Sequence, residues 1–111
     1  MNALEELKAF LGEGEKVRGI VFGSWGAGYG EPAPPPVPLE MRGKLLTLEA
    51  AAPMMKKWTF AGGGFGSPEC YAMYAWTDRR VIWVTQNELG ATWLDSAPRN
   101  PTAIMPIMPG G

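Results

Sequence analysis

The last third of the chain limits the fold more than any other part, because aromatic and β-branched residues dominate it. The segments Tyr71–Trp76, Arg80–Gln86 and Ala91–Asp95 have the composition of β-strands. Residues 77–79 join the first pair, and Gly90 is placed to supply the left-handed residue of a second tight turn. The pattern predicts an antiparallel meander.

Both faces of this meander are apolar. Side chains alternate between the faces of a strand, and a sheet with one wet face carries polar residues there. Here one face of the first strand presents Tyr71, Met73 and Ala75, and the other Ala72, Tyr74 and Trp76; the second strand divides into Val81, Trp83 and Thr85 against Ile82, Val84 and Gln86. Helices are expected to cover one face. The other needs long loops of the same chain, a sheet rolled into a barrel, or a second copy of the protein.

The rest of the chain supplies those helices and further strands. Residues 2–11 have a helical apolar pattern, with Asn2 as cap and Glu5 placed to bond back to it. Residues 48–57 form a second helical pattern after Thr47, and Pro53 should shorten, kink or restart it. Lys16–Phe22 is expected to be a strand, and Arg42–Leu46 a weaker one.

These elements predict the α+β class in a single domain spanning residues 1–111. We expect a mostly antiparallel sheet of four or five strands, with an N-terminal helix and a short second helix. A long loop rich in glycine and proline is expected over 23–40, and an extended proline-rich tail over 97–111.

Composition argues against several functional classes. The chain has no histidine and one cysteine, which excludes histidine-based triads, histidine-ligated zinc and an internal disulfide. We therefore expect no enzyme activity, no cofactor and no metal site. A net charge of −1 gives no basic footprint for a nucleic acid, and charged residues near the start interrupt any signal sequence. The expected setting is cytoplasmic, with no membrane partner.

Several motifs have a plainer interpretation than the functional one. The glycines of 26–30 and 62–66 are not followed by a helix start that would hold a phosphate, so they are interpreted as connectors. The prolines of 32–38 fit a Pro-x-x-Pro ligand but are more simply a stiff linker or rim. Cys70 is interpreted as a buried apolar residue. The arginines at 79, 80 and 99 are expected to pair with Asp78 and Asp95 rather than bind an anion.

The aromatic residues divide into two groups. Core packing is the expected role of Trp76, Trp83 and Trp93. Trp25 and Tyr29 follow a strand in a glycine-rich segment, and we expect them to be interface anchors or ligand contacts. With Phe65 they define an alternative function, in which a monomer binds a flat small molecule or a peptide.

The C-terminal tail points to self-association. It carries no charged side chain between residues 100 and 111, and its apolar residues are Ala103, Ile104, Met105, Ile107 and Met108. The plainer alternative is a tail packed on its own subunit. A further hypothesis is that the tail was engineered as an apolar contact surface; polar residues at 103, 104 and 107 of a natural parent would support it. The sequence thus favours a non-enzymatic domain of unknown native activity that forms homo-oligomers.

Overall fold

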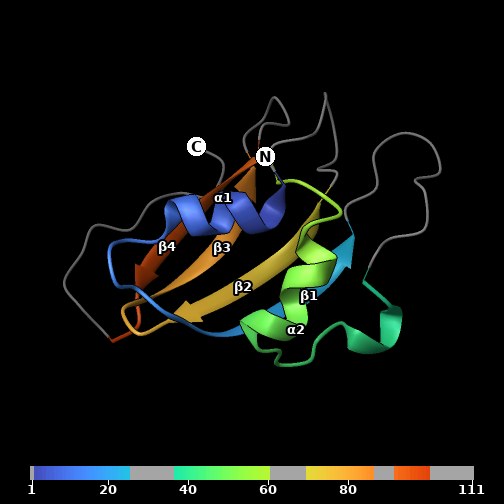
Figure 1. The fold of residues 1–111 in the computed structure, drawn as a ribbon, viewed down its shortest axis with the longest axis horizontal. Coiled ribbons are helices and arrows are strands. Elements are labelled where there is room, and N and C mark those ends of the chain that lie inside the picture. Colours follow the sequence, from blue (N-terminus) through green and yellow to red (C-terminus); the bar gives the residue numbers. More distant parts are fainter. Residues whose placement is uncertain (1, 26–36, 61–69, 87–91, 101–111) are drawn as a thin grey trace.

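The computed structural model describes residues 2–25, 37–60, 70–86 and 92–100. In chain order the elements are α1 (Ala3–Phe10), β1 (Val17–Trp25), the 3₁₀ turn η1 (Leu39–Met41), α2 (Leu48–Met55), β2 (Tyr71–Thr77), β3 (Arg80–Gln86) and β4 (Thr92–Pro98). The strands form one four-stranded antiparallel sheet in the order β1-β2-β3-β4 (Figure 1). The α+β class and the meander are confirmed, and the predicted fifth strand is not among the described elements.

Both helices begin where their caps were predicted. The side chain of Asn2 accepts a hydrogen bond from the Glu5 N–H at 2.9 Å, and the Glu5 carboxylate accepts one from the Asn2 N–H at 3.0 Å. This reciprocal pair is a capping box. Thr47 caps α2 through the N–H of Ala50. The second helix contains Pro53 and lasts eight residues, so it is short, which was one of the three expected outcomes.

One predicted strand and the bounds of two predicted segments differ in the structure. Residues 42–46 do not form a strand: only Leu46 pairs with β1, through a single bridge to Ile20. The segment turns at Gly43, whose φ of 73° ends extended pairing. The predicted loop 23–40 begins later, because β1 runs to Trp25, and its end is taken up by η1. The predicted tail 97–111 begins inside β4, which ends at Pro98.

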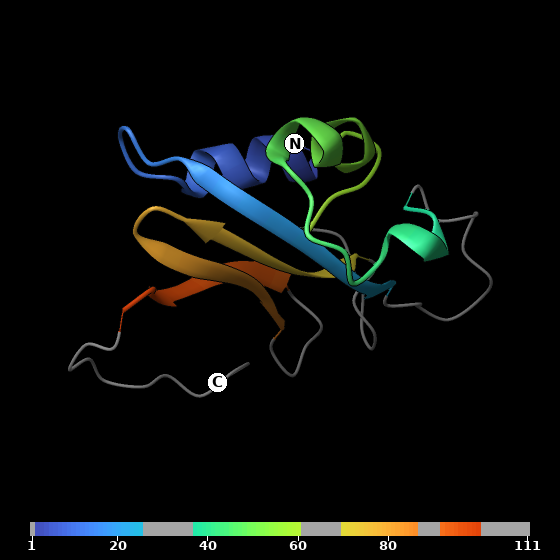
Figure 2. The ribbon, with the colours of Figure 1, turned by 90° about the horizontal axis from the view of Figure 1, so that it is seen from below.

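The molecule has a helical layer on one face of the sheet. Figure 2 shows α1 and α2 on the same side, as the sequence predicted. Between these helices and the sheet lies the apolar core. Its members come from every layer: Leu4 and Leu7 from α1, Ala51 and Met55 from α2, and Ile20, Phe22, Tyr71, Met73, Ala75 and Ile82 from the sheet.

Aromatic rings fill the end of this core that lies near β1. Trp58 packs edge-on against Phe22, with ring centroids 5.7 Å apart, and against Phe60 at 4.9 Å. It also lies 5.1 Å from the ring of Tyr71. The Trp58 carbonyl accepts a hydrogen bond from the Ala3 N–H. The segment after α2 therefore joins both helices to the sheet.

Candidate functional site

The face of the sheet opposite the helices is the candidate site. Its position follows from register, because directly paired residues of neighbouring strands point to the same side. We call it the outer face, and it comprises Gly19, Val21, Gly23, Ala72, Tyr74, Trp76, Val81, Trp83, Thr85, Asp95 and Ala97. Two rows of directly paired residues cross it: Val21–Tyr74–Trp83–Asp95 and Gly19–Trp76–Val81–Ala97.

Large apolar side chains remain accessible on the outer face. Tyr74 is 55% exposed, whereas its neighbours Met73 and Ala75, which point toward the helices, are buried. Trp76 and Trp83 are half-buried. The rings of Tyr74 and Trp76 lie 5.8 Å apart and are tilted by 46°, so they form one continuous aromatic surface.

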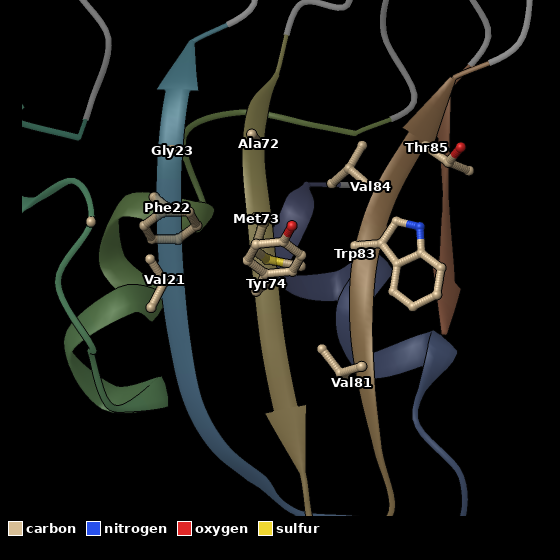
Figure 3. A pocket seen from close by; sticks show the side chains of 11 residues that line it. Val21, Phe22, Gly23, Ala72, Met73, Tyr74, Val81, Trp83, Val84 and Thr85 are labelled. Atoms are coloured by element: carbon tan, nitrogen blue, oxygen red, sulfur yellow. The ribbon is translucent and has the colours of Figure 1, made fainter. Parts of the chain in front are cut away.

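A hollow adjoins these aromatic side chains. Figure 3 looks onto the outer face, with the helices behind the sheet and with Tyr74 and Trp83 side by side on β2 and β3. The cavity has a volume of about 680 Å³, and small residues form part of its lining: Gly23, Gly43 and Ala72. A Cβ added to Gly23 would lie 3.1 Å from the Cβ of Ala72. The hollow therefore depends on the small size of these residues.

The edge of the sheet at β1 is occupied by the chain itself. Ile20 and Leu46 exchange both backbone hydrogen bonds, at 2.8 and 2.7 Å, and the Gly43 N–H donates to the Phe22 carbonyl at 2.8 Å. The side chain of Leu45 lies over Gly19, where an added Cβ would meet it at 2.6 Å. A partner strand would have to displace this segment to pair with β1.

The edge at β4 is blocked by side-chain chemistry. The Arg99 N–H donates a hydrogen bond to the Arg79 carbonyl, on the side of β3. Along an antiparallel strand, every second residue bonds to the same neighbour. The even-numbered positions 96 and 98 therefore turn their backbone N–H and carbonyl groups toward the free edge. The Asp95 carboxylate accepts the Ser96 N–H at 2.8 Å, and Pro98 has no N–H. Two of the groups that a partner strand would use are therefore removed.

A charged cluster on the helix side anchors the loop after α1. The Glu15 carboxylate accepts hydrogen bonds from Arg80, from the Thr77 hydroxyl at 2.6 Å and from the Gly12 N–H at 2.8 Å. Its side chain is 1% exposed. The Arg80 bonds lower the pKa of Glu15 from 4.5 to about 2, although burial acts in the opposite direction.

Arg80 has several further partners, which makes it a structural residue. Its guanidinium donates to the Phe10 carbonyl at 2.6 Å and to the Ser96 hydroxyl at 3.1 Å, and it lies 4.6 Å from the centre of the Phe10 ring. The expected pairing of Arg80 with Asp78 or Asp95 is therefore wrong, because its partner is Glu15. Asp78 approaches Arg79 instead, at 3.9 Å.

The burial expected of Cys70 is confirmed. Desolvation raises the pKa of its thiol to about 11, which disfavours the thiolate form. The described residues hold no group of three or more side chains suited to a metal ion. Within the same residues, no helix combines the length and the apolar character needed to cross a membrane.

The interface residues predicted from the sequence lie outside the described part of the structure. They are Tyr29, Ala103, Ile104, Met105, Ile107, Met108 and the side chain of Trp25, together with Phe65 of the alternative function. Trp76 and Trp83 were expected in the core, and that expectation is wrong. The alternation of side chains along the strands groups Tyr74, Trp76 and Trp83 on one face. It does not tell which of the two apolar faces the helices cover.

Comparison with known proteins places the chain in no family: no protein-family model, curated protein or solved structure matches it. The function is therefore inferred from the geometry of the outer face.

Proposed function

We propose that the protein is a non-enzymatic, self-associating domain whose outer face packs against a second copy. The observation that supports this most is Tyr74, which is 55% exposed beside the half-buried Trp76 and Trp83. Contiguous apolar surface of this kind marks contact sites on soluble proteins. Covering a large apolar side chain contributes roughly 1.5–3 kcal/mol, so a few such residues supply a substantial part of a binding energy.

The state of the sheet edges favours association face to face. The 43–46 segment occupies the edge at β1, and Asp95 and Pro98 interrupt the one at β4. Edge-to-edge pairing needs a row of free backbone groups. Sheets that pack face to face instead bury alternate side chains, and the outer face presents such side chains.

The C-terminal tail belongs to the same proposal. Its apolar residues Ala103, Ile104, Met105, Ile107 and Met108 come after β4 in the sequence. We propose that they add to the contact between copies, as do Trp25 and Tyr29. An engineered origin for this tail remains a hypothesis that a natural parent sequence would test.

The cavity on the outer face favours a second candidate function. A volume of about 680 Å³ is within the range of small-molecule sites, roughly 300–1,000 Å³, and most of the lining residues are apolar. In this alternative the protein is a monomer, and a flat molecule or a peptide lies against Tyr74 and Trp83. In the sequence, the aromatic residues Trp25, Tyr29 and Phe65 suggest the same alternative.

The proposal includes a cytoplasmic setting without a nucleic acid or membrane partner. The buried free thiol of Cys70 is compatible with a reducing compartment. Net charge is −1, so nonspecific attraction to phosphate backbones or anionic lipid contributes little.

Sedimentation equilibrium at micromolar concentrations tests the proposal. Wild-type protein should give a mass above that of one chain, and Tyr74→Lys should lower it toward the monomer. Leu39→Lys is the matched control, because Leu39 is 74% exposed but lies on η1, away from the outer face. A wild-type protein that stays monomeric at every concentration would contradict self-association. Tryptophan fluorescence during titration with planar ligands would then test the second candidate function.

A further inference from the structure

The outer face is raised at one end of its strands. Toward the Thr77 end of β2, two neighbouring rows consist mainly of large apolar side chains. They are Trp76 and Val81 in one row, and Val21, Tyr74 and Trp83 in the next. The side chain of Leu45, which is 72% exposed, lies over Gly19 and completes the first row on the β1 side.

The next positions along the strands are low. Gly23 and Ala72 come two residues beyond Val21 and Tyr74, and they form part of the lining of the hollow (Figure 3). Both are on the same side of the sheet, because a Cβ added to Gly23 would lie 3.1 Å from the Cβ of Ala72. The Tyr74 side chain, which is 55% exposed, is therefore beside a hollow of about 680 Å³.

A projecting side chain and a hollow on one face make that face complementary to itself. In a symmetric dimer both copies use the same surface, so a projection of one copy must meet a hollow of the other. A two-fold axis parallel to the strands keeps the order of the rows. Tyr74 would then meet Tyr74, and the two hollows would face each other as a void. An axis perpendicular to the strands reverses the order, which brings Tyr74 of each copy over the hollow of its partner.

We infer that the second copy is related by a two-fold axis perpendicular to the strands, with Tyr74 of each protomer against the partner's Gly23 and Ala72. This inference rests on the proposed function, because it specifies how the same outer face receives its partner. Among the residues that define the outer face, Asp95 is the one charged side chain, so shape contributes more than charge to the orientation. The two Asp95 side chains lie at the edge of this contact, where solvent and salt screen their repulsion.

Substitutions at positions 72 and 74 test the inference by sedimentation equilibrium. Ala72→Phe fills the hollow and Tyr74→Ala removes the ring that enters it, so each should weaken association by about tenfold or more. Ala72 is exposed, so the fold has room for a larger side chain there. Ala72→Ser is the matched control, because it keeps the residue small and should associate like wild type. Circular dichroism checks that each variant folds, and Ala72→Met fills the same hollow with a more flexible side chain.

The double variant Ala72→Phe/Tyr74→Ala distinguishes the two axes. With the perpendicular axis, the ring added at position 72 enters the space that Tyr74 leaves in the partner. The double variant should then associate more tightly than Ala72→Phe. With the parallel axis, the two added rings would fill the facing hollows, so Ala72→Phe alone would not weaken association. Removal of Tyr74 would then make the double variant weaker than Ala72→Phe.

The outcomes separate this inference from the proposed function. Weakened association of Ala72→Phe with recovery in the double variant would support the perpendicular axis. An Ala72→Phe protein that associates as tightly as wild type, or a double variant no tighter than Ala72→Phe, would overturn the perpendicular axis but leave the proposed self-association intact. A wild-type protein that does not associate would overturn both.

Discussion

The carboxylate of Glu15 and the guanidinium of Arg80 meet side-on, with Nε–Oε2 and Nη2–Oε1 both at 2.9 Å. The two residues are 65 positions apart, and the pair joins the loop after α1 to the start of β3. Because the carboxylate is buried, its charge depends on this partner.

The Glu15 pKa makes stability depend on pH. It is about 2 in the folded protein, below the usual 4.5, so the unfolded chain binds the proton more readily. The stabilisation is complete above the unfolded pKa and is lost as pH falls from about 5 toward 2, by on the order of 3 kcal/mol. Urea unfolding across this pH range should show that the free energy of unfolding of wild type and that of Glu15→Gln converge as pH falls. A difference that is constant with pH would contradict this role for Glu15.

Removal of Arg80 alone should strongly lower the free energy of unfolding, because it leaves a buried carboxylate without its partner. Arg80→Met leaves the Glu15 carboxylate buried without its cation, which costs about 3–5 kcal/mol. The double variant Glu15→Gln/Arg80→Met should lose less than the sum of the two single losses in urea unfolding. Additive losses would mean that the two side chains act independently.

Tyr71→Phe should weaken the link between β2 and residue 37. The Tyr71 hydroxyl accepts the Val37 N–H at 3.0 Å and lies 3.3 Å from the Val37 carbonyl, which it can reach as a donor. Both groups are buried, so losing the hydroxyl should cost about 1–3 kcal/mol of unfolding free energy. Thermal unfolding measures this cost, and Tyr74→Phe is the exposed control. Equal midpoints for wild type and Tyr71→Phe would contradict the assignment.

Gly43→Ala should destabilise the segment that covers the β1 edge. Gly43 has a φ of 73°, in the left-handed region where a Cβ costs about 1–2 kcal/mol. Hydrogen exchange should accelerate at the Ile20 and Leu46 amides, which bond across this edge. Gly12→Ala, at a glycine without positive φ, provides the comparison. Unaltered exchange at both amides would show that the turn does not hold the segment in place.

Local signals predicted most of the elements. Asn2 and Thr47 have cap geometry because their short side chains reach N–H groups three residues ahead. The meander was predictable because its strands are dense in aromatic and β-branched residues and are joined by short turns. The single bridge made by Leu46 was not predictable, because one paired residue leaves no alternating pattern in the sequence.

Long-range pairing and the choice of face were not predictable. The Glu15–Arg80 pair spans most of the chain, and no spacing rule connects its two residues. As a large aromatic residue, Trp76 was expected in the core. It lies on the outer face because it is two residues from Tyr74 on the same strand, so both side chains point to the same side. The helices cover the Met73 face, and only tertiary packing determines that choice.

Hydroxyl-radical footprinting of Tyr74 at increasing protein concentration shows whether the outer face is the contact surface between copies. Self-association through the outer face predicts that modification of Tyr74 and Trp83 falls as concentration rises, while modification of Leu39 stays constant. Modification of Tyr74 that is independent of concentration, in a sample whose mass shows oligomers, would contradict the assignment of the outer face as the contact surface.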